Sequence, residues 1–414
     1  MDDDQHGISD RIKLFLKVCG PGLIVMLADT DAGCLITAAQ SGSQFGYSMI
    51  LPQLLLIPIL FMAQEMTVRL GIVTKQGHGE LIRKHFGGGW AVLSAATLLI
   101  SVIGALLTEM IGIAGVGELF GISKWITVPF ATLILLVVSF KNSYHKVEHI
   151  GVAVGLFELM FIIALIVVKP DLSSMWNGIK TVPFENSSYL YLVAANVGAV
   201  IMPWMIFYQQ GAVIDKKLTP KMIKREQLDT GIGTVITQGI MIGFVVLFAA
   251  ATAKHRSSPL NTVGDLVNTL APFLGSDWAK LIMGASILGG ALVAAIVVSL
   301  SGTWGITEVL NIRHSLNDRV NKQSAGFYTT LTLIYIVGAA VALFNNHTVE
   351  LAVLVEVINA LMLPIVLGFL LLLEAKALPK EYRMKGIYRW TVIICSLVVM
   401  GFGLYMVGPM LKLW

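Results

Sequence analysis

Several carboxylates occur in this chain within stretches that are otherwise apolar. They are Asp29, Asp31, Glu65, Glu109, Glu158, Asp229 and Glu356. Asp29 and Asp31 stand closest together, in the segment Ala28-Asp29-Thr30-Asp31-Ala32-Gly33. On an intact helix two such residues would point about 200° apart, because each residue turns the helix by about 100°. In an unwound segment, both side chains and the freed carbonyls of residues 28–33 could line one cavity, and such oxygen ligands suit Mg²⁺, Mn²⁺ or Ca²⁺.

Sulfur near these carboxylates would soften the predicted cation site. Cys34 follows the acidic segment directly, and Met202 lies in a second interruption farther along the chain. Sulfur ligands disfavour Mg²⁺ and Ca²⁺ and favour Mn²⁺ or Fe²⁺. On spacing alone, however, ordinary packing explains both residues better, since Met commonly fills gaps between helices.

The other carboxylates have more modest explanations. Glu65 and Arg69 are four residues apart near the end of one apolar stretch, which predicts a structural ion pair. Asp229 lies near the end of another stretch and is interpreted as a polar helix-end residue. Glu158 has no obvious partner, and no role is predicted for it.

Membrane-spanning helices must position these residues. Of the 414 residues, 56% are hydrophobic and 13% are charged, and the mean hydropathy is +0.79. Soluble domains carry about 25% charged residues, so the composition predicts an all-α bundle whose outer surface faces lipid. Apolar stretches of about 20 residues predict eleven spanning helices, at 14–43, 48–70, 90–118, 123–140, 148–168, 187–210, 228–252, 279–303, 326–344, 349–374 and 389–410.

Basic residues alternate between the two sides of this predicted bundle. With the amino terminus in the cytoplasm, 22 of the 29 Lys and Arg residues fall on the cytoplasmic side and 7 fall outside. The positive-inside rule expects such an excess. We therefore predict a multi-pass protein of the cell membrane with a cytoplasmic amino terminus and an external carboxyl terminus. The net charge of +4 follows this topology and does not indicate a nucleic-acid partner.

Interruptions recur at matching places in two halves of the chain. We predict a single transmembrane domain over 1–414, divided into a first repeat at 14–168, an inverted second repeat at 187–374 and an extra helix at 389–410. The first helix of each half is interrupted, by the acidic segment in one case and by Asn196-Val197-Gly198-Ala199 with Met202-Pro203 in the other. Interrupted helices at matching positions indicate a binding site near the middle of the membrane.

Other functions fit the sequence less well. Cys19, Cys34 and Cys395 are too scattered for a disulfide framework or a zinc site, and the amino terminus does not resemble a secretory signal peptide. The histidines lie in loops or at helix ends and form no His-Glu-x-x-His cage, so we expect no enzymatic activity and no cofactor. A cation-coupled amino-acid symporter of the same architecture stays open as an alternative, and so does a channel.

Several segments resemble the NRAMP family of divalent metal transporters, over nearly the whole chain. They are GPGLIVMLADTDAG (20–33), RLGIVTKQGHGELIRKHFG (69–87), LLTEMIGIAGVGELFGI (106–122), GAVIMPWMIFYQQ (198–210) and VEVINALMLP (355–364). The resemblance implies the fold shared with bacterial amino-acid symporters, with two inverted five-helix repeats plus one helix and with helices 1 and 6 broken. It also implies a metal site. Asp31 and Met202 occupy the positions of the family's metal-binding Asp and Met, Ala199 and Ala28 fall where the family lends carbonyls, and Glu356 falls where a Gln approaches the metal.

This sequence also departs from the family pattern. Ala32 replaces a Pro, Cys34 replaces a ligand Asn, Trp204 replaces a His, and Leu106 replaces an Asp that takes up a proton, whereas the neighbouring Glu109 is kept as a candidate proton or polar relay. These changes resemble the NRAMP-related magnesium transporter branch, in which proton coupling is absent. We therefore expect uncoupled movement of the cation. A potential of 100 mV contributes about 2.3 kcal/mol per charge, which suffices to concentrate a divalent ion.

The expected substrate is Mn²⁺ or Mg²⁺. Asp29 and Glu356 supply extra carboxylate, which favours Mg²⁺ or Mn²⁺, whereas Met202 favours Mn²⁺ or Fe²⁺. Mn²⁺ satisfies both signals, so we expect it to be carried, with Mg²⁺ close behind as the physiological alternative. The expected partners are the metal ion and membrane lipid, and a monomer is compatible with the sequence.

Overall fold

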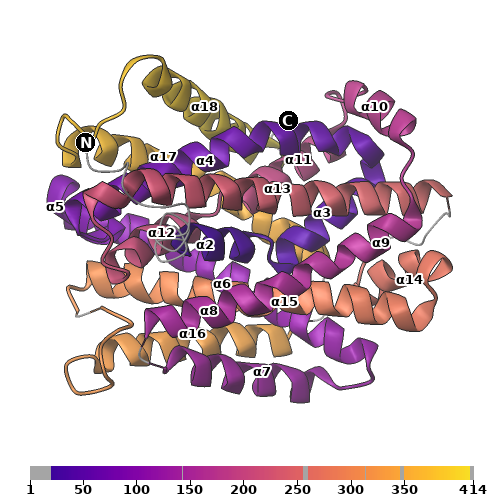
Figure 1. Ribbon diagram of the computed structural model, residues 1–414, viewed down its shortest axis with the longest axis horizontal. Coiled ribbons are helices and arrows are strands. Elements are labelled where there is room, and N and C mark those ends of the chain that lie inside the picture. The colour runs from indigo at the N-terminus through magenta and orange to yellow at the C-terminus, as the bar shows by residue number, and fades with distance from the viewer. Residues whose placement is uncertain (1–19, 142, 255–259, 313, 346–348, 411–414) are drawn as a thin grey trace, which may run out of the picture.

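The chain forms a bundle of long helices. The structure, a computed structural model, describes residues 20–141, 143–254, 260–312, 314–345 and 349–410, and within them all regular elements are helices (Figure 1). Nine stretches of the described chain are long and apolar enough to cross a membrane. The chain is therefore an all-α, multi-pass membrane protein, as the composition predicts. Residues 14–19 of the first predicted span, including Cys19, lie outside the described residues.

The long helices lie side by side in Figure 1, and shorter helices connect several of them. In chain order the elements are α2 (Pro21–Asp29), α3 (Ala32–Phe45), η1 (Gly46–Met49), α4 (Ile50–Thr74), α5 (His78–Phe86), α6 (Gly88–Leu119), α7 (Lys124–Ser139), α8 (Tyr144–Gly155), η2 (Leu156–Met160), α9 (Phe161–Val168), α10 (Leu172–Lys180), α11 (Ser187–Val200), α12 (Pro203–Asp215), η3 (Pro220–Met222), α13 (Ile223–Lys254), α14 (Val263–Leu274), α15 (Ser276–Val309), α16 (Ala325–Leu343), α17 (Val349–Ala377), α18 (Gly386–Tyr405) and α19 (Val407–Met410). The α elements are α-helices, and the η elements are short 3-10 helices.

The predicted spans correspond to these helices, with differences in length. Part of the span 14–43 and the whole of 48–70 form one continuous stretch, Ala32–Thr74, in which the chain turns at Gly46 with a φ of 60°. The span 123–140 is the shorter α7, with 16 residues. The sequence does not predict α5, α10 or α14, because helices of 9 to 12 residues are too short to cross a membrane.

Both predicted helix interruptions are confirmed. Thr30 and Asp31 separate α2 from α3, and Ile201 and Met202 separate α11 from α12. Pro203 follows the second break directly and occupies the first turn of α12, where its missing N–H group is tolerated. In the middle of a helix the same residue would remove a hydrogen bond, so the chain breaks at this point.

Close packing around the breaks depends on glycine. A Cβ atom at Gly198 in α11 would lie 1.7 Å from the carbonyl oxygen of Glu356 in α17. A Cβ atom at Gly42 in α3 would lie 2.2 Å from the carbonyl oxygen of Val245 in α13. Small residues let membrane helices approach closely, so these two glycines allow α17 and α13 to pack directly against the broken helices.

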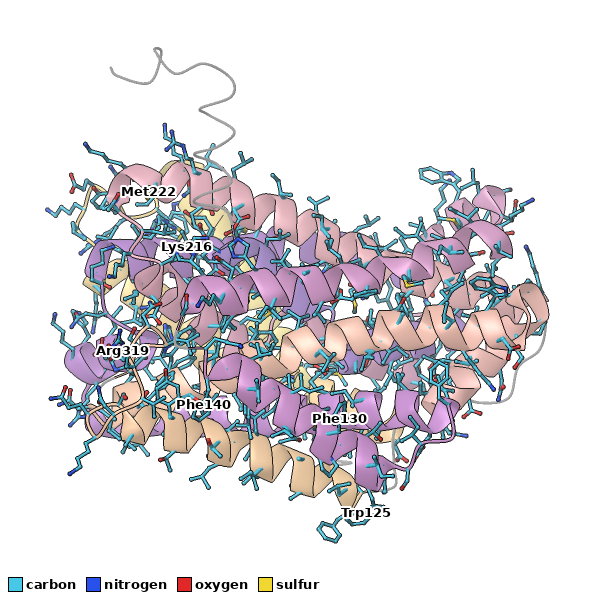
Figure 2. All side chains as sticks on the ribbon, turned by 60° about the horizontal axis from the view of Figure 1, so that its bottom comes forward. Trp125, Phe130, Phe140, Lys216, Met222 and Arg319 are labelled. Atoms are coloured by element: carbon cyan, nitrogen blue, oxygen red, sulfur yellow. The ribbon has the colours of Figure 1, made fainter. Side chains whose placement is uncertain are left out.

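Basic and aromatic side chains lie on the outer surface of the bundle. Lys216 and Arg319 lie toward one end in Figure 2, and Trp125 lies at the lower edge of the view, away from that end. Trp125 and Phe130 are 54% and 63% exposed, as is typical of aromatic side chains on a surface that faces lipid and its interface. The end that carries Lys216 and Arg319 is the one predicted to face the cytoplasm.

Candidate metal site

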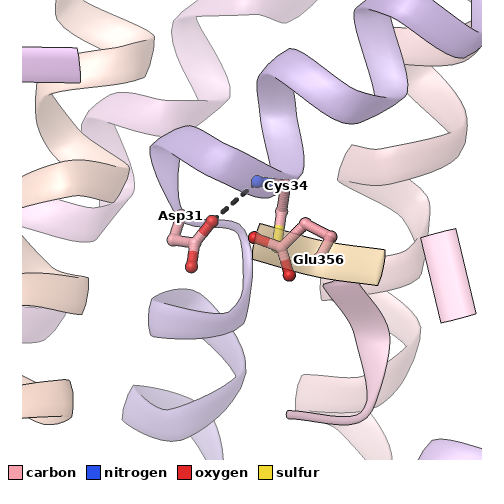
Figure 3. A group of neighbouring side chains, drawn as sticks. All are labelled: Asp31, Cys34 and Glu356. Carbon is pink, nitrogen blue, oxygen red and sulfur yellow. Dashed lines mark hydrogen bonds between the residues drawn. The ribbon is translucent and has the colours of Figure 1, made fainter. Parts of the chain in front are cut away.

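Three potential metal ligands from two helices meet at the first break. Ligand atoms of Asp31, Cys34 and Glu356 all lie within 4.8 Å of one another, and all three residues are fully buried (Figure 3). Asp31 is the N-cap of α3, and Cys34 follows it by three residues, so one helical turn places both side chains together. Glu356 comes from α17, which packs against α3.

One oxygen of each carboxylate is engaged and the other is free. Asp31 Oδ1 accepts a hydrogen bond from the backbone N–H of Cys34 at 2.7 Å, and Glu356 Oε2 accepts one from Asn359 Nδ2 at 3.0 Å. Asp31 Oδ2 and Glu356 Oε1 are buried without a hydrogen-bond partner. A Cβ atom at Gly33 would lie 2.7 Å from Glu356 Oε1, so this glycine leaves room for the free oxygen. Unpaired buried carboxylate oxygens are costly, and a bound cation would offset that cost.

The second break releases a backbone carbonyl beside this cluster. In a continuous helix the carbonyl of Ala199 would accept a hydrogen bond from residue 203, but Pro203 has no N–H group. The thiol of Cys34 donates to the Ala199 carbonyl instead, at 3.2 Å. Pro203 therefore explains why this carbonyl faces the cluster rather than its own helix.

The first break releases a carbonyl in a different way. The N–H group of Ala32 would reach back to the carbonyl of Ala28 in a continuous helix, but it donates to Glu109 Oε2 at 3.1 Å. Glu109 lies in α6 and also neighbours Asp31. Its carboxylate thus holds the first turn of α3 away from α2.

Two further acidic residues flank the first break. Asp29 is 1% exposed, and neither of its carboxylate oxygens has a hydrogen-bond partner. The hydroxyl of Thr30 donates to Glu158 Oε2, and Glu158 lies in η2, the 3-10 segment between α8 and α9. Within the described chain, no ion pair joins Asp29, Asp31 or Glu356 to a basic side chain. No role was predicted for Glu158 from the sequence. The one signal that could have indicated a role was the presence of a carboxylate within an apolar helix.

Met202 and the residues that replace the family's polar groups are also buried. Met202 is the N-cap of α12, and its sulfur accepts a hydrogen bond from Trp204 Nε1 at 3.1 Å. Leu106 is fully buried in α6. It packs closely against Gly338 in α16, because a Cβ atom added at Gly338 would lie 2.9 Å from the Cβ atom of Leu106. An apolar helix contact therefore lies at position 106, and an indole that donates to Met202 lies at position 204.

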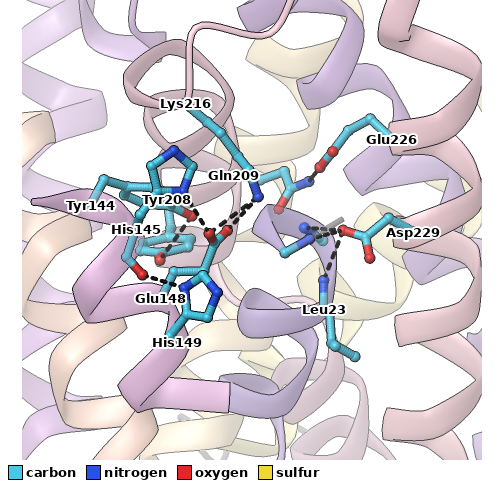
Figure 4. Close-up of polar contacts among 12 residues, drawn as sticks. Leu23, Tyr144, His145, Glu148, His149, Tyr208, Gln209, Lys216, Glu226 and Asp229 are labelled. Atoms are coloured by element: carbon cyan, nitrogen blue, oxygen red, sulfur yellow. Dashed lines mark hydrogen bonds and ion pairs between the residues drawn. The ribbon is translucent and has the colours of Figure 1, made fainter. Parts of the chain in front are cut away.

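The remaining carboxylates are structural. Arg69 Nε lies 2.6 Å from Glu65 Oε1, which confirms the predicted ion pair, and Arg69 also contacts Glu374 at 3.4 Å. Asp229 is more than a polar helix end, because its Oδ2 atom accepts hydrogen bonds from the backbone N–H groups of residues 20, 22 and 23 at the start of α2 (Figure 4). Nearby, Lys216 Nζ contacts Glu148 at 2.9 Å. The Asp229 hydrogen bonds anchor the amino end of α2.

Known proteins similar to this chain share both its sequence and its fold. A divalent metal cation transporter MntH of Staphylococcus haemolyticus is 29% identical over 304 residues, which cover 69% of this chain and 66% of the relative. An MntH of Verminephrobacter eiseniae is 26% identical over 305 residues, covering 70% and 68%. The aligned region thus spans about two thirds of each relative.

Solved structures extend the similarity of fold to almost the whole chain. The manganese transporter of Eremococcus coleocola superposes with a TM-score of 0.79 at 17% identity, covering 98% of this chain and 88% of that one. MhsT in complex with L-phenylalanine gives a TM-score of 0.60 at 12% identity, covering 93% and 98%. The predicted symporter-like fold is therefore confirmed.

The family follows from the match along the chain. The family model described as natural resistance-associated macrophage protein-like, Nramp, matches residues 22–408. This range includes both helix breaks and every residue of the Asp31, Cys34 and Glu356 cluster. The chain therefore belongs to the Nramp family, a family of membrane transporters and not of enzymes.

Proposed function

We propose that this protein carries a divalent metal cation across the membrane by alternating access. The observation that carries the proposal is the buried cluster at the first break, where ligand atoms of one thiol and two carboxylates lie within 4.8 Å of one another and each carboxylate keeps one oxygen without a hydrogen-bond partner. Asp31, Cys34 and Glu356 would ligate the ion. The names of the relatives, divalent metal cation transporter and manganese transporter, agree with such a substrate.

Further ligands would come from both breaks. The released carbonyls of Ala199 and Ala28 would supply oxygen, and Asp29 would supply a second carboxylate from the first break. Met202 would supply sulfur. Its hydrogen bond from Trp204 occupies only one lone pair of the thioether, and the second lone pair would face the ion. In this role, Trp204 orients the sulfur.

Mn²⁺ is the first expected substrate, and Mg²⁺ is the second. Oxygen ligands from Asp31, Asp29 and Glu356 suit both ions. Sulfur from Cys34 or Met202 favours Mn²⁺. Resemblance to the magnesium branch of the family rests on the replacements at residues 32, 34, 106 and 204, and it keeps Mg²⁺ as the physiological alternative.

Transport is expected to proceed without protons. Leu106 and Trp204 cannot ionise, and both are buried. Glu109 accepts a hydrogen bond from the backbone of Ala32, which supports a positioning role for its carboxylate rather than release of a proton in each cycle. With the predicted cytoplasmic amino terminus and external carboxyl terminus, an inside-negative potential would drive uptake at about 4.6 kcal/mol per divalent ion at 100 mV.

A cation-coupled amino-acid symporter is the alternative function. The similarity to MhsT, whose structure contains L-phenylalanine, concerns the fold. An amino-acid carboxylate would have to lie beside Asp29, Asp31 and Glu356, and no basic side chain of the described residues pairs with these three. The substrate carboxylate and these side-chain carboxylates would repel one another strongly in a membrane interior, so the site favours a cation.

Uptake into proteoliposomes tests the proposal. Mn²⁺ and Mg²⁺ would be followed with internal dyes, and internal pH would be recorded in parallel, for the wild type and Asp31→Ala. We expect saturable metal uptake without acidification and its loss in Asp31→Ala. Acidification coupled to the metal would contradict the uncoupled mechanism, uptake that does not saturate would indicate a channel, and amino-acid binding without metal uptake would favour the symporter.

A further inference from the structure

An apolar groove lies on the outer surface between the start of α6 and the second half of α17. Its volume is about 430 Å³, and its lining includes Phe86, Trp90, Leu93, Pro364, Gly368 and Phe369. Trp90 is 55% exposed and Leu93 is 39% exposed, so the groove opens away from the protein. In a membrane protein, such an opening faces lipid.

Aromatic rings and a glycine shape this groove. The rings of Phe86 and Trp90 both lie edge-on to Phe369, with centroids 5.6 and 5.8 Å away. Gly368 leaves the space between them open, because a Cβ atom there would meet only Met400 Cε, at 3.8 Å. The groove is therefore an aromatic-walled gap that a slender apolar chain can enter.

One end of the groove is basic. Lys376 Nζ lies 4.5 Å from the centroid of the Phe86 ring, and Lys84 Nζ donates a hydrogen bond to the neutral side chain of Gln76 at 2.9 Å. Burial and the charges of Lys84 and Lys376 lower the pKa of His85, so both lysines lie near this side chain. Within the described chain, neither lysine forms an ion pair with a carboxylate. Lys376 thus lies at the mouth of the groove, and Lys84 belongs to the same basic cluster around His85.

The groove lines α17 from Pro364 to Leu372, and Lys376 lies one helical turn beyond it. Pro364 and Lys376 are separated by twelve residues of α17, or about 18 Å along a helix. The hydrocarbon core of one leaflet is about 15 Å thick, half of a bilayer core of about 30 Å. A chain that begins at the lysines and follows α17 would therefore reach close to the middle of the membrane.

We propose that this groove binds an anionic glycerophospholipid, with its phosphate at Lys376 and Lys84 and one acyl chain along α17. The charge of the headgroup complements the two lysines, and the apolar lining suits the acyl chain. In the predicted orientation the site lies in the cytoplasmic leaflet, the leaflet that basic residues close to a membrane recognise through its anionic lipids. The proposal does not depend on which substrate the protein carries.

Lipid retention by the purified protein tests the charged end of the site. The protein would be reconstituted in an equal mixture of phosphatidylglycerol and phosphatidylcholine, and the lipids that remain bound after mild detergent extraction would be identified by native mass spectrometry. The wild type should retain phosphatidylglycerol preferentially. In a Lys84→Gln/Lys376→Gln variant this preference should fall by about fivefold for each lysine removed. A Lys141→Gln/Lys322→Gln variant, which removes two loop lysines away from the groove, should keep it.

A second variant tests the apolar part. Gly368→Leu fills the groove but keeps both lysines, and the space around Gly368 allows the substitution without a backbone clash. We expect it to lose the retained lipid while its unfolding temperature stays within a few degrees of the wild type. An unchanged phosphatidylglycerol preference in Lys84→Gln/Lys376→Gln, or an unchanged amount of bound lipid in Gly368→Leu, would overturn the proposal.

Discussion

Removal of the Asp229 carboxylate should loosen the amino end of the broken helix α2. A single oxygen, Asp229 Oδ2, accepts hydrogen bonds from the N–H groups of Gly20, Gly22 and Leu23 at 3.0, 2.9 and 3.2 Å. N–H groups in the first turn of a helix have no partner within the helix, and a negative charge there is also stabilised by the helix dipole. Asp229 therefore fixes α2 to α13 at the end of the molecule predicted to face the cytoplasm.

The magnitude of this effect follows from the contact. A hydrogen bond to a charged group contributes about 1.5–3 kcal/mol. The three N–H groups share one oxygen, and water would replace it once α2 moved away, so we take the net value as that of one strong bond, about 2–3 kcal/mol. Each 1.4 kcal/mol changes an equilibrium tenfold. Asp229→Ala should therefore raise the population of the open state, in which the amino end of α2 has moved away from α13, by about 30-fold to 150-fold.

Cys34 provides a built-in reporter of this opening, because it is fully buried beside the first break. In a Cys19→Ser/Cys395→Ser background, the labelling rate of Cys34 by a membrane-impermeant thiol reagent would be measured from each side of sealed vesicles. Asp229→Ala should accelerate labelling from the predicted cytoplasmic side by the factor given above. Asp229→Asn should have a smaller effect, because an amide oxygen still accepts a hydrogen bond.

A matched control separates this effect from general loss of helix capping. Asp265 caps α14, where its Oδ2 atom accepts hydrogen bonds from the N–H groups of Asn261 and Thr262 at 2.9 Å each. Figure 1 places α14 at the opposite end of the molecule from α12 and the start of α2. Equal labelling rates in Asp229→Ala and Asp265→Ala would refute the reasoning, because they would show that the Asp229 contact does not hold α2 in place.

Three further predictions concern the site and its surroundings. Pro203→Ala restores an N–H donor for the Ala199 carbonyl, and this donor would compete with the ion for the carbonyl oxygen. Mn²⁺ binding, measured by calorimetry, should weaken by about twofold to 12-fold, the value of one neutral hydrogen bond of about 0.5–1.5 kcal/mol. Unchanged affinity would mean that this carbonyl is not a ligand. Met202→Ala and Cys34→Ser should each lower the ratio of Mn²⁺ to Mg²⁺ affinity, because they remove sulfur, and a ratio equal to that of the wild type in both would exclude sulfur from the site. Burial lowers the pKa of His78 to about 4, whereas an unfolded His titrates near 6.5. As the pH falls, the unfolded state therefore binds a proton before the folded state does. The free energy of unfolding should decrease by up to about 3 kcal/mol between pH 6.5 and pH 4. Thermal unfolding in detergent should show a shallower pH dependence for His78→Gln, and identical slopes would contradict the burial argument.

Local features of the sequence predicted much of the fold. The lengths of the apolar stretches predicted the spanning helices, because a bilayer requires about 20 apolar residues. Pro203 predicted the second break because it lacks an N–H group, and the pair Asp29 and Asp31 predicted the first. The proximity of Asp31 and Cys34 also follows locally, since an N-cap residue and the third residue after it share one turn.

Contacts between distant segments could not be predicted in this way. Glu356 was connected with the site only through the family resemblance, because nothing in α17 itself indicates which helix it packs against. The cap that Asp229 forms on α2 joins residues more than 200 positions apart. Glu158 likewise depends on η2 lying beside Thr30. Helices buried on several sides carry little periodicity to show which face meets which neighbour, so such pairs emerge only from the folded structure.

The central claim, that a divalent cation binds at the first helix break, can be tested most directly by diffraction. Crystals grown with Mn²⁺ would be measured above the manganese absorption edge, and the anomalous difference map would be compared with that from Asp31→Ala. We predict one strong peak among the side chains of Asp31, Cys34 and Glu356 in the wild type and none there in the variant. A peak elsewhere in the protein with no peak in this cluster would contradict the proposed site.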